Sequence, residues 1–98
     1  MRIIHSVLFS LKHKKGSPEA EAFLAESLSV LSTIGQVCGF RVYNQVSQKN
    51  KFEYAFSMVF ETEEDYAAYN QNENHQNYVK TLWTNQVTDF MEVDLQAH

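Results

Sequence analysis

The chain has 98 residues, of which 44% are hydrophobic and 20% are charged, with one proline and three glycines. This length and composition indicate one globular domain, residues 1–98, and exclude a disordered, collagen-like or low-complexity chain. The formal net charge of −4 argues against a nucleic-acid binder, which needs cations to displace the counterions of phosphate. A single cysteine, Cys38, excludes an intramolecular disulfide.

Residues 2–11 are expected to form the first strand. Alternate positions share one face of it, and these positions are Ile3, His5, Val7, Phe9 and Leu11. The apolar run is too short to cross a bilayer, and it ends in a basic cluster where a signal peptide needs small residues. We therefore expect a cytoplasmic protein that does not associate with membranes.

The next segment predicts a helix. Ser17 is the expected N-cap, Pro18 suits the first helical position, and apolar residues then recur at helical spacing as far as Ile34. Gly35 is the expected stop signal.

Two further strands are predicted over residues 36–46 and 52–60, with the polar turn 47–51 between them. In the second of these strands, aromatic and apolar residues share one face. They are Phe52, Tyr54, Phe56, Met58 and Phe60.

A second helical region is expected to begin after Thr62 and to be kinked or interrupted by the polar run 70–74. Helical spacing resumes at His75 and Tyr78, and a last strand is expected at about 88–95. The order β-α-β-β-α-β predicts an α+β, ferredoxin-like fold. In this fold both helices cover one face of a four-stranded antiparallel sheet, and the first and third strands are central.

The face of the sheet without helices is small and half apolar instead of charged. Its apolar members are Ile4, Leu8, Ala55 and Val59. Such a patch is typical of an interface, so we expect a homodimer that pairs through its sheets into a dimeric α/β barrel. The alternative is a mildly apolar face that stays in contact with water.

Histidines supply the candidate chemistry. Their spacing matches no zinc motif and the chain has no glycine-rich phosphate loop, so no metal or cofactor is expected. His5 and His75 are both predicted to point between sheet and helices, where Tyr69 and Tyr54 could join them. Such a group could act as acid, base or hydrogen-bond donor, or each histidine could be a satisfied part of the core.

RNA-recognition domains share this order of elements, and Tyr54-Ala55-Phe56 is similar to the aromatic centre of their RNP1 motif. The basic residue, the glycine and the final aromatic residue of that motif are missing. We therefore expect no nucleic-acid partner.

Three segments together resemble the stress-responsive dimeric α/β-barrel (Dabb) family. The first is the run from Ile4 to Leu11 with its histidine, the second is Val59-Phe60-Glu61-Thr62, and the third is the stretch from Tyr69 to Tyr78. The resemblance covers nearly the whole chain. It implies ferredoxin-like protomers that pair through their sheets, and most members have no assigned activity.

One plant branch of that family, the olivetolic acid cyclase type, closes a linear polyketide without a cofactor. Its pocket uses a tyrosine and a histidine six residues apart, and Tyr69 and His75 match this spacing. His5 matches its histidine of the first strand. Two positions differ, because Ser27 stands where the cyclase has a tyrosine and Tyr54 where a histidine is common.

The leading hypothesis is a homodimeric Dabb protein that binds a small, partly apolar molecule between sheet and helices. His5, Tyr69 and His75 would be its polar or catalytic groups. The other expected ligand contacts are Val7, Phe9, Phe23, Tyr54, Phe56 and Tyr78. The alternatives are a cofactor-free acid/base enzyme acting on a carbonyl compound, and a structural dimer without a pocket.

Overall fold

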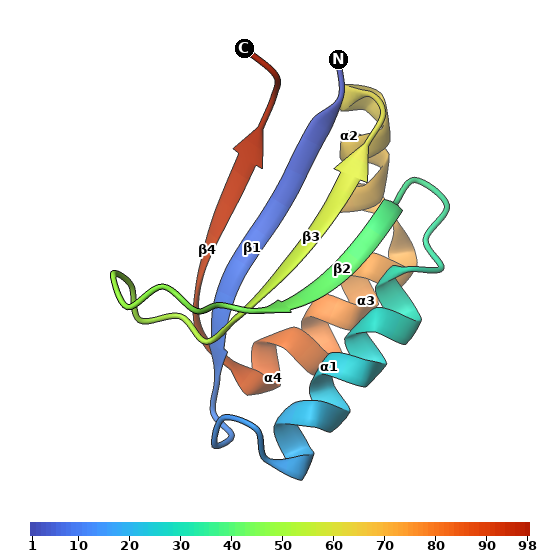
Figure 1. The fold of residues 1–98 in the computed structure, drawn as a ribbon. Helices are drawn as coiled ribbons and strands as arrows, with labels where there is room; N and C mark the ends of the chain where they lie inside the picture. Colours follow the sequence, from blue (N-terminus) through green and yellow to red (C-terminus); the bar gives the residue numbers. More distant parts are fainter.

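The computed structural model describes residues 1–98 as a four-stranded antiparallel sheet with all helices on one face (Figure 1). The strand order is β2-β3-β1-β4, so the first and third strands are central, as predicted. The elements are β1 (Ile3–Leu11), α1 (Pro18–Leu31), β2 (Cys38–Asn44), β3 (Tyr54–Phe60), α2 (Glu63–Gln71), α3 (Glu73–Tyr78), the π-helix η1 (Val79–Trp83), α4 (Thr84–Gln86) and β4 (Val87–Leu95). None of the helices is long and apolar enough to span a membrane.

The two central strands follow the predicted alternation. Every second residue of β1 from Ile3 to Leu11 is buried, and so is every second residue of β3 from Tyr54 to Phe60. In the register of the pair, Val7 lies opposite Phe56 and His5 opposite Met58. The predicted inner faces are therefore confirmed from Ile3 to Leu11 and from Tyr54 to Phe60, while Phe52 is buried but precedes β3.

The start of α1 is confirmed and its end is not. The Ser17 side chain accepts a hydrogen bond from the Ala20 amide, and Pro18 is the first helical residue. The helix ends at Leu31, short of the predicted end near Gly35. Thr33 donates its side-chain hydroxyl to the Val30 carbonyl at 2.7 Å, and such local bonds compete with the helical pattern.

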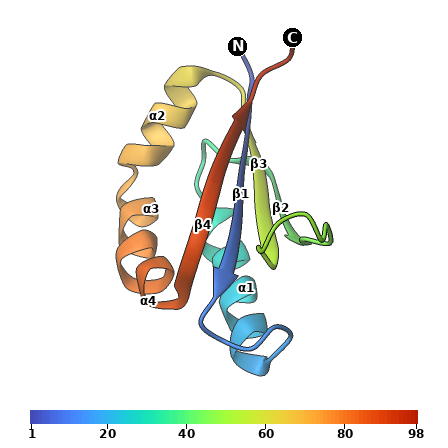
Figure 2. The same ribbon diagram turned by 90° about the vertical axis from the view of Figure 1, so that its left-hand side faces the viewer.

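The second helical region is interrupted where the polar run predicted it. Asn72 ends α2 in an extended conformation and caps α3, because its side chain accepts hydrogen bonds from the amides of Asn74 and His75. Figure 2 shows the chain from α2 to α4 passing along one side of the sheet before it enters β4. The interruption lets this long connection turn, and it places His75 in the first turn of α3.

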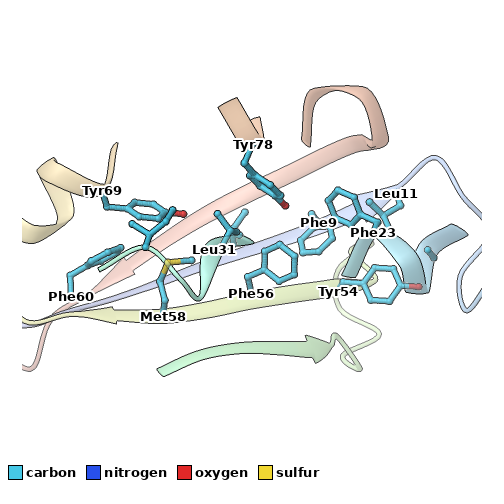
Figure 3. Close-up of a cluster of buried hydrophobic side chains, with 13 residues drawn as sticks. Phe9, Leu11, Phe23, Leu31, Tyr54, Phe56, Met58, Phe60, Tyr69 and Tyr78 are labelled. Carbon is cyan, nitrogen blue, oxygen red and sulfur yellow. The ribbon is translucent and has the colours of Figure 1, made fainter. Parts of the chain in front are cut away.

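Aromatic side chains dominate the space between sheet and helices (Figure 3). Phe9 and Phe56 lie with ring centroids 4.6 Å apart, and Trp83 of η1 lies 5.1 Å from Phe9. Phe60 contacts Tyr69 at 4.9 Å near the other end of the sheet. These aromatic contacts hold the second helical region against β1 and β3.

The opposite face of the sheet has no helix on it. Ile4 pairs with Val59 and Leu8 with Ala55 in the strand register, and β4 adds Met91, which is 51% exposed. Val93 and Leu95 lie on the same side, since they pair with Ser6 and Ile4. This face is as apolar as predicted, and β4 contributes more to it than the sequence indicated.

Candidate functional site

A cavity of about 360 Å³ lies between the sheet and the chain from α2 to α4. Strands β1, β3 and β4 supply one wall, while α3 and η1 supply much of the other. Most of its lining is apolar, and Trp83 and Phe90 are among the aromatic members. The polar lining residues are His5, Asn70, His75, Thr84 and Glu92, and Tyr69 and Tyr78 add their hydroxyl groups.

The structure brings together the three residues expected to carry the chemistry, because His5, Tyr69 and His75 all line this cavity. The other expected ligand contacts divide into two groups. Val7, Phe56 and Tyr78 line the cavity, whereas Phe9, Phe23 and Tyr54 are not among its lining residues.

Tyr54 does not reach the histidines, contrary to the expectation from the sequence. Its hydroxyl accepts a hydrogen bond from the Gly16 amide at 3.1 Å, in the loop before α1. The alternation along β3 places Tyr54 four residues before Met58, which pairs with His5, so it lies at the other end of the strand. Tyr54 therefore anchors a loop to the core and stays outside the cavity.

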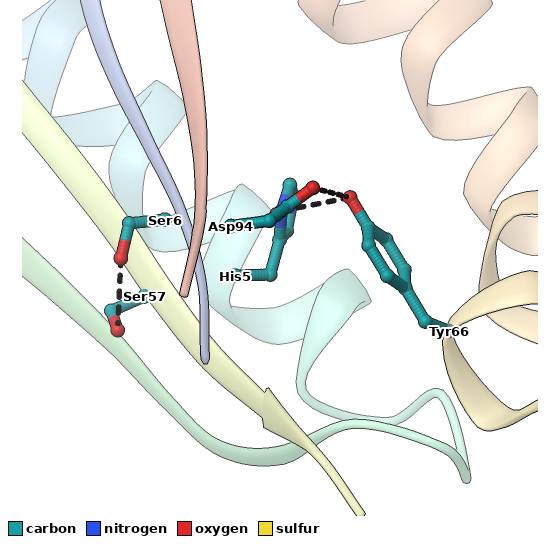
Figure 4. Close-up of polar contacts among 5 residues, drawn as sticks. All are labelled: His5, Ser6, Ser57, Tyr66 and Asp94. Atoms are coloured by element: carbon teal, nitrogen blue, oxygen red, sulfur yellow. Dashed lines mark hydrogen bonds and ion pairs between the residues drawn. The ribbon is translucent and has the colours of Figure 1, made fainter. Parts of the chain in front are cut away.

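His5 is held by two residues that sequence reasoning did not single out (Figure 4). Its Nδ1 lies 2.5 Å from Oδ1 of Asp94 and 3.0 Å from the Tyr66 hydroxyl, which in turn donates to Oδ2 of Asp94 at 2.9 Å. A carboxylate can only accept, so Nδ1 carries a proton toward Asp94. In neutral His5 the other ring nitrogen, Nε2, is then the acceptor.

One signal in the sequence could have found Asp94. Glu92 and Asp94 alternate with the apolar residues of β4, so both carboxylates share a face of that strand. Pairing of β4 with β1 places Asp94 opposite His5 and Glu92 opposite Val7. The sequence alone did not give this register. The hydroxyl contacts of Tyr66 depend on where α2 lies against the sheet, which the sequence does not show.

Tyr69 and His75 form the second polar pair, with ring centroids 4.1 Å apart. Nδ1 of His75 is buried and has no hydrogen-bond partner. Burial lowers the pKa of His75, more than the nearby backbone carbonyl of Asn70 raises it. The neutral imidazole therefore predominates at neutral pH, and it can accept a proton or a hydrogen bond from a guest.

Tyr69 is only 3% exposed. Figure 3 shows its hydroxyl pointing along the sheet, on the side of the ring that faces Tyr78. Burial is the main cause that raises the pKa of Tyr69 above its ordinary value, and the charge of Glu92 adds to it. The phenol thus stays protonated and is a hydrogen-bond donor. A donor and a neutral acceptor side by side suit a carbonyl or hydroxyl group.

The Ser27 and Tyr78 hydroxyls lie 2.7 Å apart, and Ser27 also donates to the Phe23 carbonyl at 2.7 Å. Ser27 is the position at which the cyclase type has a tyrosine. Here the serine ties Tyr78, a lining residue, to α1. No group of three or more histidine, cysteine or acidic residues is placed to hold a metal ion.

Comparison with known proteins decides the family. Residues 3–97 match the stress-responsive A/B barrel domain, Dabb. The chain belongs to the Dabb family. Among functionally curated proteins, none matches the sequence.

Solved structures agree with this assignment. A Dabb family protein with a ferredoxin-like fold from Mesorhizobium loti is 34% identical, with a TM-score of 0.97 over 99% of this chain and 97% of that one. A dimeric ferredoxin-like protein of unknown function from Thermobifida fusca is 15% identical, with a TM-score of 0.78 over 99% and 92%. The hydroxynitrile lyase of Passiflora edulis shares the Dabb chain's fold at 9% identity, with a TM-score of 0.83 over 99% and 94%.

Proposed function

We propose that this Dabb protein is a homodimer that binds a small, partly apolar molecule in the cavity, with His5, Tyr69 and His75 as its polar contacts. The observation that carries this proposal is the unpartnered, buried Nδ1 of His75 beside Tyr69 in a cavity of about 360 Å³. An unpaired polar atom in the interior costs free energy, so a hydrogen-bonding guest would offset that cost.

The size and lining of the cavity support a guest of this kind. Its volume falls within the range of about 300–1,000 Å³ that is usual for small-molecule sites. Aromatic walls from Phe56 and Trp83 favour a flat or partly apolar guest. A purely structural dimer with a filled core would not need a cavity that contacts both His5 and His75.

The direct test compares wild type with His75→Gln. Ligand-observed NMR would screen both proteins against uncharged aromatic ketones and phenols, and thermal unfolding would measure stability. We expect the wild type to bind members of this set, and we expect His75→Gln to lose them with a nearly unchanged unfolding midpoint. The matched control is His98→Gln, which removes an exposed histidine at the C-terminus.

Two outcomes would reject the proposal. One is that no uncharged fragment binds to the wild type. The other is that His75→Gln lowers stability by about 1–3 kcal/mol, as expected when a satisfied core group loses its partner, while the fragments still bind.

Acid/base catalysis on a carbonyl compound is the second candidate, and the Tyr69–His75 pair favours it. Tyr69 would donate a hydrogen bond to the carbonyl oxygen, and neutral His75 would take a proton from the adjacent carbon. The simplest assay is exchange of the α-hydrogens of an aryl ketone for deuterium in D₂O. Exchange that depends on both Tyr69 and His75 would support an enzyme, and exchange at the buffer rate would reject it.

The homodimer is supported by the helix-free face of the sheet. Its apolar residues are arranged over three strands, and Ile4 and Met91 are 41% and 51% exposed. Contiguous apolar surface of this kind on a small protein favours association. The dimeric state described for the Thermobifida fusca relative points the same way.

A further inference from the structure

Glu92 places a negative charge at the cavity. It lies opposite Val7 in the β1–β4 register, on the side of the sheet that faces the helices, and it is one of the lining residues. Strand β4 is an edge strand of the sheet, and Glu92 is exposed. The carboxylate therefore sits where the cavity meets water.

No cation neutralises this charge. The ion pairs of the chain join Arg2 to Glu61, His5 to Asp94, and Lys51 to Asp89, and Glu92 takes part in none of them. The cavity lining contains no lysine or arginine. Lys80 borders an adjoining depression together with His75, but it does not line the cavity itself.

The neighbouring carboxylate is in a different situation. Asp94 is engaged by the Tyr66 hydroxyl and by Nδ1 of His5. Glu92 is thus the carboxylate of the cavity whose charge remains uncompensated. Its effect extends to the interior, because it contributes to holding Tyr69 in the protonated form.

A guest with its own negative charge would meet two penalties in this site. Apolar walls cannot replace the water around a carboxylate, and the negative charge of Glu92 repels a second carboxylate at the mouth of the cavity. An uncharged ketone of the same shape meets neither penalty, and it can still accept a hydrogen bond from Tyr69.

We propose that the cavity accepts uncharged ligands and rejects carboxylates of the same shape, with Glu92 as the residue that sets this preference. The inference rests on the proposed function, because it assumes that the cavity binds a small molecule. It adds the charge class of that molecule and names a specificity residue outside the His5, Tyr69 and His75 group.

The test uses an isosteric pair, 2-acetylnaphthalene and 2-naphthoate, in which a methyl group replaces a carboxylate oxygen. Calorimetric titration at pH about 8, where ordinary histidines are neutral, gives the two dissociation constants for each protein. We expect wild type to prefer the ketone. Glu92→Gln should tighten 2-naphthoate binding about threefold to tenfold and leave ketone binding unchanged. Glu21→Gln, the same charge change on α1, should alter neither constant.

Salt gives an independent reading. Raising ionic strength from about 0.01 M to about 0.1 M shortens the Debye length from about 30 Å to about 10 Å. This change should improve 2-naphthoate binding to wild type and have little effect on Glu92→Gln.

The outcomes separate this inference from the function on which it rests. If the ketone binds and the carboxylate binds as tightly, or if Glu92→Gln leaves their ratio unchanged, the charge preference is wrong and the binding function stands. If neither probe nor any uncharged fragment binds, the binding function itself fails, and the preference fails with it.

Discussion

Removing the Ser27 hydroxyl should cost more stability than removing the Tyr78 hydroxyl, because only one of the two can donate the hydrogen bond between them. Ser27 is fully buried, and its single hydroxyl proton goes to the Phe23 carbonyl, which can only accept. Tyr78 must therefore donate its proton to Oγ of Ser27 across 2.7 Å. The two hydroxyls are thus not equivalent, and removing one or the other should have different costs.

Tyr78→Phe removes a donor and leaves the bond between Ser27 and Phe23 in place. We expect it to lower the free energy of unfolding by about 1 kcal/mol. Ser27→Ala instead leaves the hydroxyl of Tyr78, a residue only 5% exposed, without its acceptor. The expected loss is about 1–3 kcal/mol, reduced by about 0.5 kcal/mol because alanine is the better helix former.

The assay is urea unfolding followed by the fluorescence of Trp83, the single tryptophan of the chain, at one fixed protein concentration. The double variant should lose less than the sum of the single variants, by about 1 kcal/mol. Tyr43→Phe is the matched control, because Tyr43 is 51% exposed, and it should change stability by less than about 0.5 kcal/mol. Additive losses, or a loss for Tyr78→Phe that exceeds the loss for Ser27→Ala by more than about 0.5 kcal/mol, would refute the proton assignment.

Three further predictions concern the interface, the titration of His75 and the interrupted helix. Leu8→Asp or Val59→Asp would place an unpaired charge in the proposed dimer interface at a cost of several kcal/mol. Sedimentation should therefore show a dimer for wild type and a monomer for either variant, and a monomeric wild type would reject the interface. Folding lowers the pKa of His75, so the unfolded chain binds a proton at a higher pH than the folded protein does. The stability of wild type should therefore decrease as pH falls below about 6.5. A pH series on His75→Gln should show a smaller decrease. Asn72→Ala removes the acceptor of two α3 amides, so thermal unfolding should show a loss of about 1 kcal/mol, and an unchanged midpoint would argue against a capping role.

The fold could be predicted because its signals are local and mutually consistent. Alternation along β1 and β3 gives the buried face of each strand directly, and the side chains of Ser17 and Thr62 accept the amide bonds expected of N-caps. The end of α1 was predicted less well, because Ile34 is buried and continues the apolar spacing although the helix stops at Leu31. Burial there comes from the chain turning back onto the core, which periodicity does not distinguish from helix.

The candidate site was predictable only where it depends on which face of a strand or helix a residue occupies. The convergence of His5, Tyr69 and His75 follows from which side of each element they occupy, and the structure places all three at the cavity. Whether they bind or react is still a prediction. Tyr54 shares the inner face of β3 but lies at the wrong end of the strand, and distance along a strand needs the register of its neighbours.

Of the residues that sequence reasoning missed, Tyr66 belongs to α2, and Glu92 and Asp94 belong to the edge strand β4. In the sequence, Met91, Val93 and Leu95 alternate with Glu92 and Asp94, which gives the strand two different faces but does not say which face turns toward the helices. In the structure, the apolar side of β4 continues the helix-free face, while Glu92 and Asp94 turn toward the helices. In a monomer this arrangement leaves the apolar side of β4 in water while its carboxylates lie on the helix side of the strand. The arrangement becomes consistent when a second copy of the chain covers the apolar side. The carboxylates on the helix side then serve the cavity, because Asp94 holds His5 and Glu92 sets the charge class of the ligand. The edge strand therefore links the two proposals, and the orientation of its side chains favours both at once.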